Sequence, residues 1–347
     1  MIITEISVDG YEEVLHGVDK ETGLDAYIAI HNTKLGPALG GCRYYPYKTS
    51  DEQLKDTLRL AKGMTYKNAL AGLDLGGGKA TINALPKKTP ELWQAFAGLV
   101  NNLHGKYITS GDIGTTIQDL KKIKNHTNFV LGHDSKTDSG VATAYGVFQS
   151  IKALSKFLHG IDSLKDKTIA IQGMGKVGKR LINFCLKDGA KIIATDTNTK
   201  IFEEYQYGSL NFANISFVEP NKIYEVECDI FSPCSVGGIL NSDTISKLKC
   251  AGIAGGANNQ LETNEHAEYL KDRNIYYVPD YLTNCGGVII VEKERDNTLT
   301  DLNYESPTVK NRLDSIYNTV FKVLYQSAKT DQTTIKICND LAEGRFL

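Results

Sequence analysis

The chain has 347 residues, of which 41% are hydrophobic and 23% charged, and its formal net charge is −2. This composition excludes a disordered chain, and the balanced charge gives no reason to expect a nucleic-acid partner. No apolar run approaches the roughly 20 residues that a membrane-spanning helix needs. The chain is rich in glycine, with 32 Gly against 8 Pro. Because glycine is costly inside helices and strands, this surplus predicts special turns and close backbone approaches.

The amino terminus and the cysteines indicate the compartment. Residues 1–9 contain acids and no long apolar core, which is not the pattern of a secretory signal. The seven cysteines form no C-x-x-C pair, and the seven histidines show no metal-ligand spacing. We therefore expect free, buried thiols in a cytoplasmic protein, and no bound metal.

The first part of the chain predicts a mixed α/β domain. Residues 26–30 (AYIAI) have the composition of a strand. A helix is predicted from Asp51, where Thr49 and Ser50 provide a start signal and apolar residues recur at helical spacing through residue 63. Thr89 and Pro90 begin a further helix that continues through residue 99.

The later part alternates short apolar strands with helical stretches. Strands are predicted at 168–171 and 192–195 and near residues 230 and 253, with a helix over 179–186. Such alternation is typical of a parallel sheet with buried strands. The helical pattern over 141–158 precedes this region and predicts the connection between two domains, with a boundary near 135–145.

A glycine-rich turn follows the strand that begins at Thr168. The segment TIAIQGMGKVG (168–178) contains G-x-G-x-x-G, which is weak evidence alone in a chain with so many glycines. Here a strand precedes it, a helix follows it, and a second strand ends at Asp196, 21 positions after Gly175. This spacing is close to the roughly 20 residues that separate the turn from the ribose-binding acid of a Rossmann-type domain.

The turn predicts a pyrophosphate site at the amino terminus of the following helix. Asp196 would accept hydrogen bonds from the ribose and repel a 2′-phosphate, so NAD is favoured over NADP. The alternative is a glycine-lined turn with no ligand. The predicted cofactor-binding residues of the turn are Gly173, Met174, Gly175, Lys176, Val177, Gly178 and Lys179.

Three charged residues in the first half are candidates for chemistry. Lys79 follows three glycines and precedes an apolar strand, and a lysine among small apolar neighbours tends to have a lowered pKa, which suits a general base or a carbonyl polariser. Lys67 near a helix end is alternatively a solvated lysine that interacts with the helix dipole. Asp112 lies between glycines and is alternatively a turn residue.

Taken together, these segments resemble the Glu/Leu/Phe/Val dehydrogenase family, most closely its leucine and phenylalanine types. The match is specific because the segments occur in the family's order and span most of the chain. The matching stretches are GPALGGCR (36–43), GMTYKN (63–68), GGGK (76–79), DIGT (112–115), QGMGKVG (172–178), PCSVGGILN (233–241), ANNQL (257–261) and PDYLTNCGG (279–287).

The resemblance implies a fold and a reaction. The fold is α/β: an N-terminal substrate domain over 1–136, a Rossmann-type NAD domain over 137–310 with a cleft between the two, and C-terminal helices in 311–347 that pack back on the first domain. The reaction is the reversible, NAD-dependent oxidative deamination of an L-amino acid to its 2-oxo acid and ammonia. A homo-oligomer of unstated size is implied as well.

The resemblance also assigns roles to the residues of the matching motifs. Lys67 would hold the substrate α-carboxylate, helped by the backbone of Gly40 and Gly41. Lys79 would polarise the carbonyl and activate water, and Asp112 would move protons to and from the amino group.

Further matching positions face the cofactor or the substrate. Thr143 would lie near the nicotinamide carboxamide. Asn258, Asn259 and Asn284 match asparagines that face the cofactor or the substrate.

The identity of the amino acid depends on a few pocket positions, which the resemblance places at Leu39, Ser110, Val288 and Val291. Val288 is typical of leucine-type members, and Ser110 stands where these have Ala and phenylalanine-type members have Gly. Both favour a branched aliphatic substrate. The segments 40–43 and 173–178 instead look like the phenylalanine type, and Ser110-Gly111 departs from the Ala-Glu of the leucine type, so phenylalanine remains the alternative.

Two other classes of function are open. A non-catalytic NAD-binding sensor needs the glycine-rich turn but not the two lysines and Asp112. A hydroxy-acid dehydrogenase normally uses a histidine base, and only His133 lies near a candidate motif.

Overall fold

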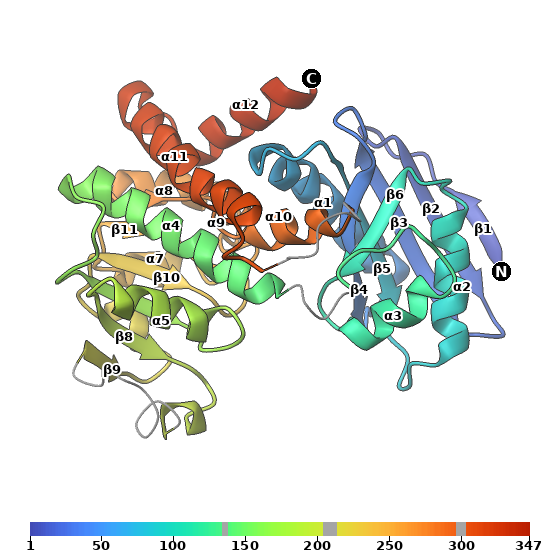
Figure 1. Cartoon of the computed structure of the whole chain (residues 1–347), viewed down its shortest axis with the longest axis horizontal. Coiled ribbons are helices and arrows are strands. Elements are labelled where there is room, and N and C mark those ends of the chain that lie inside the picture. Colours follow the sequence, from blue (N-terminus) through green and yellow to red (C-terminus); the bar gives the residue numbers. More distant parts are fainter. Residues whose placement is uncertain (134–137, 204–213, 296–302) are drawn as a thin grey trace. The chain divides into compact units, whose positions relative to one another are not determined.

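The computed structural model describes residues 1–133, 138–203, 214–295 and 303–347. The chain forms two compact units (Figure 1). The first unit comprises Met1–Thr137, Val291–Asn303 and Leu341–Leu347, and the second comprises Asp138–Ile290 and Tyr304–Asp340. Within the described residues, no helix is both long and apolar enough to cross a membrane. All seven cysteines are free thiols, and five of them are buried.

The first unit is built on a six-stranded mixed sheet of order β1-β2-β3-β5-β4-β6. The strands from β1 to β5 pair antiparallel in this order, whereas β4 runs parallel to both β5 and β6. The strands are β1 Ile2–Glu5, β2 Glu13–Asp19, β3 Leu24–Asn32, β4 Ala38–Tyr45, β5 Gly76–Asn83 and β6 Tyr107–Gly111, and the helices are α1 Ser50–Leu70, α2 Pro90–Asn101 and α3 Ile117–Lys124.

Both predicted helix starts are present. Thr49 caps α1 by accepting a hydrogen bond from the amide of Glu52, and Thr89 caps α2 by accepting one from the amide of Leu92. Threonine at this position satisfies an amide that has no partner inside the helix. The predicted strand 26–30 lies inside β3.

The two faces of the central strands differ in character. Ala80 and Ile82 of β5 belong to an apolar core that includes Trp93 and Phe96 of α2. Because side chains alternate along a strand, Lys79 and Thr81 point to the opposite face, which α1 covers. Thr81 marks that face, since its hydroxyl lies 2.6 Å from the hydroxyl of Thr57 on α1.

The second unit contains a six-stranded, fully parallel sheet of order β12-β11-β10-β7-β8-β9. The strand order reverses at β7, and this Rossmann-like arrangement places ligands at the carboxyl ends of the strands beside the reversal. The strands are β7 Thr168–Gln172, β8 Lys191–Thr195, β9 Ile215–Phe217, β10 Ile230–Pro233, β11 Gly252–Ile253 and β12 Tyr276–Tyr277. The helices are α4 Ser139–His159, α5 Gly178–Lys187, α7 Ser242–Lys247, α8 His266–Asp272, α9 Asp280–Thr283, α10 Gly286–Glu292, α11 Pro307–Thr330 and α12 Thr334–Phe346, and α10 and α12 each continue into the first unit.

The C-terminal helices depart from the expectation that residues 311–347 pack on the first domain. Helix α11 packs against α4 in the second unit, where Gly146 leaves room for Ile316 and the hydroxyl of Tyr145 donates to Asp314 at 2.7 Å. Only Leu341–Leu347 belong to the first unit, together with Val291–Asn303, which were expected in the second. The apolar stripe of α11 therefore meets α4 of its own unit.

Candidate active site

The face of the first sheet that α1 covers carries the predicted substrate residues. Partners in parallel strands point to the same face, and the register pairs Arg43 with Thr81 and Gly41 with Ser110. Lys79 lies two residues before Thr81 and therefore shares this face. The strand register thus brings charged groups from β4 and β5 to one surface beside Ser110 of β6.

Helix α1 approaches this surface closely at Gly77. A Cβ atom on Gly77 would lie 2.0 Å from the amide nitrogen of Thr65, so only glycine allows the helix and β5 to be this close. The side-chain amide of Asn68 donates to the carbonyl of Gly76 at 2.6 Å. These contacts fix the last turn of α1, and with it the backbone of the half-buried Lys67.

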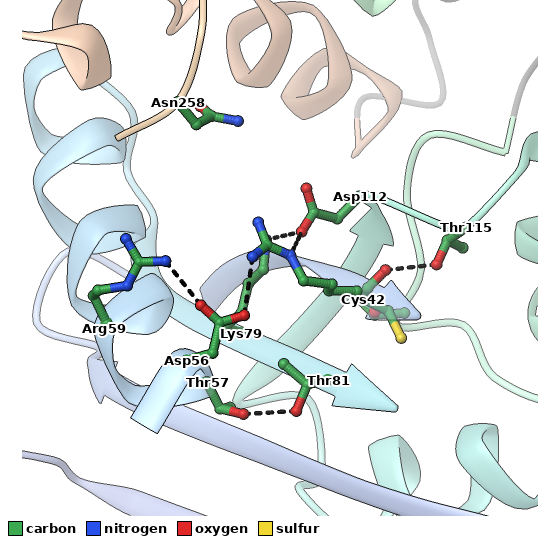
Figure 2. A network of polar contacts seen from close by, with 12 residues as sticks. Cys42, Asp56, Thr57, Arg59, Lys79, Thr81, Asp112, Thr115 and Asn258 are labelled. Carbon is green, nitrogen blue, oxygen red and sulfur yellow. Dashed lines mark hydrogen bonds and ion pairs between the residues drawn. The ribbon is translucent and has the colours of Figure 1, made fainter. Parts of the chain in front are cut away.

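Asp112 lies just after β6 and accepts two charged hydrogen bonds on one oxygen. Its Oδ2 atom is 2.9 Å from Nζ of Lys79 (Figure 2). The same oxygen is 2.9 Å from Nε of Arg43. The three side chains are 14%, 6% and 11% exposed, respectively. Burial alone would raise the pKa of Asp112, but the charges of Lys79 and Arg43 outweigh it and hold this pKa well below its usual range. The carboxyl is therefore ionised at neutral pH.

Arg43 connects Asp112 to a second carboxylate, Asp56 of α1. Its Nη1 atom donates to Oδ2 of Asp56 at 2.9 Å, and the hydroxyl of Tyr47 donates to the same oxygen at 2.8 Å. Arg59 contacts the other oxygen, Oδ1, at 2.8 Å. Burial opposes ionisation of Asp56, yet the charge of Arg43 and these hydrogen bonds lower its pKa.

Sequence reasoning did not assign a role to Arg43 or Asp56. One sequence signal pointed to Arg43, because an arginine in a strand of otherwise small and apolar residues needs a buried partner. The structure adds that the buried face of α1 is polar, since it includes Gln53, Thr57 and Asn68.

The glycine-rich turn of the second unit fits a dinucleotide pyrophosphate. Gly173 has a φ of 96°, which favours glycine, and a Cβ on Gly178 would lie 1.9 Å from the carbonyl oxygen of Gly173. A Cβ on Gly175 would meet nothing within 4 Å, so the backbone there is open to a ligand. The first amides of a helix have no partner inside it and, together with the helix dipole, favour an anion. In α5 the amide of Lys179 donates to the carbonyl of Gly175 in the turn.

The neighbouring predicted residues are distributed around this turn. Met174 is buried, Lys176 is exposed and Lys179 is half-buried, and Val177 occupies the N-cap position of α5 without a side-chain hydrogen bond. Asp196 follows β8, and its Oδ2 accepts a hydrogen bond from the amide of Met174 at 2.7 Å. The acid predicted to bind the ribose therefore also holds the turn.

The remaining polar candidates lie on helices and turns of the second unit. The hydroxyl of Thr143 donates to the carbonyl of Ser139 at 2.7 Å. The side-chain amide of Asn284 donates to Oδ1 of Asn258 at 2.8 Å, whereas its own Oδ1 is buried and has no hydrogen-bond partner among the described residues. Asn259 adopts a φ of 51° and donates its amide to Asp280 at 2.9 Å. A buried acceptor without a partner is a position for a ligand's donor.

The residues of the predicted side-chain pocket are divided between the two units. Leu39 is buried on β4, and Ser110 is half-buried on β6. Val288 and Val291 lie on α10, the former in the second unit and the latter in the first. The pocket as a whole therefore stays a prediction.

A buried lysine–aspartate pair in one unit and a glycine-rich turn that fits a pyrophosphate in the other are the features expected of a dehydrogenase. Comparison with sequence families identifies the family of dehydrogenases to which the chain belongs. Residues 13–129 match the model described as "Glu/Leu/Phe/Val dehydrogenase, dimerisation domain". Residues 135–204 and 195–344 match that of "Glutamate/Leucine/Phenylalanine/Valine dehydrogenase". The chain belongs to this family of amino-acid dehydrogenases, as the motifs indicated.

Individual relatives cover almost the whole chain. Phenylalanine dehydrogenase of Caldalkalibacillus thermarum is 41% identical, covering 99% of this chain and 93% of its own. Leucine dehydrogenase of Thermoactinomyces intermedius is 42% identical, covering 97% of this chain and 91% of its own. Enzymes with two different substrates are thus equally similar to this protein.

Solved structures confirm the two-domain α/β fold. The crystal structure of L-tryptophan dehydrogenase from Nostoc punctiforme matches with a TM-score of 0.83 at 37% identity, covering 97% of this chain and 96% of that chain. The hetero-hexameric glutamate dehydrogenase from Thermus thermophilus matches with a TM-score of 0.76 at 21% identity, covering 99% and 87%, which supports the fold alone.

Proposed function

We propose that this amino-acid dehydrogenase uses NAD to deaminate a branched aliphatic L-amino acid, of the leucine type, to its 2-oxo acid and ammonia, reversibly. The observation that carries the chemistry is the buried pair of Lys79 and Asp112, 2.9 Å apart on the surface that α1 covers. A buried ammonium beside a buried carboxylate supplies both charges that an α-amino acid reaction needs: a cation for a developing oxyanion and a base for an ammonium proton.

The residues of the first unit would orient the substrate. Lys67 and the backbone of Gly40 and Gly41 would hold the α-carboxylate. The ionised Asp112 would accept the proton that the substrate ammonium must lose before oxidation. Its low pKa means that this carboxylate starts in the basic form.

A bound nicotinamide dinucleotide supplies the two-electron acceptor for the Cα–H bond. Loss of this hydrogen with its electron pair leaves an iminium on the amino acid. Lys79, after losing a proton to solvent, would take a proton from the water as the water oxygen bonds to the iminium carbon, and the ammonium so formed would stabilise that oxygen. Asp112 would return its proton to the nitrogen, the C–N bond would break to release ammonia, and the hydroxyl would lose its proton to solvent as the C=O bond forms.

The preference for NAD rests on Asp196. Its carboxylate follows β8 beside the glycine-rich turn, where a 2′-phosphate would meet its negative charge. We further propose a cytoplasmic homo-oligomer: the free thiols fit a reducing compartment, and the first unit matches a domain described as a dimerisation domain.

The choice of substrate rests on Val288, Val291 and Ser110. Apolar side chains are discriminated by only ~1–3 kcal/mol per methylene, so a few pocket residues decide the outcome. Phenylalanine is the alternative, supported by the relative of that specificity. The deciding experiment compares kcat/KM for L-leucine, L-valine, L-isoleucine, L-phenylalanine and L-tryptophan at saturating NAD⁺. A higher kcat/KM for an aromatic amino acid contradicts the proposal.

Two further measurements separate the other classes. Lys79→Ala should abolish NADH production and leave NAD⁺ binding intact, whereas a wild type that makes no NADH from any L-amino acid would be a sensor. If the reverse reaction with a 2-oxo acid proceeds without ammonia, the protein is a hydroxy-acid dehydrogenase instead.

A further inference from the structure

We propose that Arg43 is a positioning residue for the reaction: together with Lys79 it fixes one oxygen of Asp112, Oδ2, and leaves the other, Oδ1, to accept and return the proton. This inference rests on the proposed function, because it assigns that proton transfer to one atom of the aspartate.

The two carboxylate oxygens of Asp112 differ in their contacts. Both cations contact Oδ2, each at 2.9 Å. Among the described residues, no side-chain hydrogen bond is made to Oδ1. A carboxylate held by two charged donors on one oxygen cannot rotate about χ2 without breaking both. Oδ1 is therefore held in one place while its lone pairs stay available.

Arg43 is itself held by a second acid. Its guanidinium donates through Nε to Asp112 and through Nη1 to Asp56, so one planar group spans two carboxylates. Asp56 is fixed by α1 and by the hydroxyl of Tyr47. This geometry needs arginine, because a lysine ammonium has no rigid fork that reaches two carboxylates in one plane.

The charges alternate along this chain of contacts, from Lys79 to Asp112 to Arg43 to Asp56, so the buried charges are compensated. Among the described residues, other titratable groups that interact with these four are the phenols of Tyr47 and Tyr107, the thiol of Cys42 and the guanidinium of Arg59. Loss of Arg43 leaves Asp112 with one cation instead of two. Since burial raises the pKa of this carboxyl, that loss would move the pKa upward.

Three variants separate the charge of Arg43 from the planar geometry of its guanidinium. Arg43→Gln removes both, Arg43→Lys keeps only the charge, and Asp56→Ala keeps the guanidinium but removes its anchor. A misplacement of about 1 Å can cost about 100-fold in rate. We therefore expect all three to lower kcat by roughly 10- to 100-fold with little change in the KM for the amino acid, as for an interaction that acts on the chemical step.

The pH dependence then distinguishes positioning from a general structural role. The acid limb of the kcat profile should move to higher pH in Arg43→Gln, and stay at the wild-type position in Arg43→Lys and Asp56→Ala. Amidation of Asp112 by a carbodiimide and glycine ethyl ester, mapped by mass spectrometry, should likewise be faster in Arg43→Gln than in Arg43→Lys, independently of turnover. The matched control is Lys55→Gln, which removes a cation from an exposed position of α1 next to Asp56 in the chain and should keep wild-type kcat.

The outcomes are distinguishable. If the wild type makes no NADH from any L-amino acid, the proposed function fails and the role of Arg43 fails with it. If the wild type is active but Arg43→Lys and Asp56→Ala keep its kcat, or lose activity only through KM, the inference alone is overturned. If Arg43→Gln does not fold, Asp56→Ala and Tyr47→Phe carry the same test, because both loosen the anchor without removing the buried cation.

Discussion

The contact between Gly77 and Thr65 should control both stability and activity. In Gly77→Ala the new Cβ would lie 2.0 Å from the Thr65 amide nitrogen and 2.3 Å from its Oγ1, where an ordinary contact begins at 3.4 Å. The amide nitrogen is part of the helix backbone and cannot rotate away. The buried Oγ1 is held by a hydrogen bond with Nδ1 of His31, at 2.8 Å. Helix α1 must therefore move outward from β5, by the difference between 2.0 and 3.4 Å.

Two effects follow from this shift. Overpacking of this kind costs about 1–3 kcal/mol, and we expect the upper end because the clash is with backbone. Gly77 also lies two residues before Lys79, and Thr65 two residues before Lys67, so the clash changes the spacing of the two lysines. A displacement of about 1 Å at such a site can lower kcat/KM by about 100-fold.

The matched control is Gly63→Ala on the same helix. A Cβ there would meet nothing within 4 Å, and alanine inside a helix is favoured over glycine by about 0.5–1 kcal/mol. Urea unfolding and steady-state NADH production should show a destabilised, impaired Gly77→Ala and a slightly stabilised, fully active Gly63→Ala. Wild-type kcat/KM in Gly77→Ala would refute the idea that this contact sets the spacing of the lysines.

Three further predictions concern other parts of the molecule. Asp196→Ala removes the acceptor of the Met174 amide and should weaken NAD⁺ binding by roughly 10- to 100-fold in calorimetry; unchanged discrimination between NAD⁺ and NADP⁺ would contradict the role of Asp196. Because the pKa of Asp112 is lower in the folded than in the unfolded protein, this carboxyl contributes stability above its unfolded pKa of about 3.9. This stability is lost as the pH falls toward the folded pKa. Below about pH 4 the urea midpoint of the wild type should therefore fall more steeply than that of Asp112→Asn. Phe346 is buried against Tyr66 and Ala69, so Phe346→Ala should lower the free energy of unfolding by about 3–5 kcal/mol, and an unchanged urea midpoint would show that the C-terminal residues do not stabilise the first unit.

The features that local sequence determines were predictable. The glycine-rich turn depends on the conformation of Gly173 and on a strand and helix directly beside it, and all of this information lies within a short segment. The starts of α1 and α2 were likewise predicted from Thr49 and Thr89, because a cap acts within one helical turn.

The features that depend on partners distant in the sequence could not be predicted. Arg43 meets Asp112 through the pairing of β4 with β6, and Asp56 through the path of α1 across the sheet, and neither can be derived from the segment around Arg43. The same limit applies to α11. Its apolar spacing predicts which side is buried, whereas its packing against α4 depends on the space at Gly146.

The polar underside of α1 explains why the site can be fixed so tightly. An apolar helix face can slide or rotate on a sheet at little cost, because hydrophobic contacts are not directional. Here the hydroxyls of the buried Thr57 and of Thr81 are hydrogen-bonded, and the side-chain amide of the buried Asn68 donates to the carbonyl of Gly76. Two separate turns of the helix therefore each have a hydrogen-bond partner on β5. Any other register would leave these groups buried without partners, at about 1–3 kcal/mol each. Helix α1 carries both Lys67 and the anchor of Arg43, Asp56, so the penalty against other registers also fixes the backbone positions of these two residues.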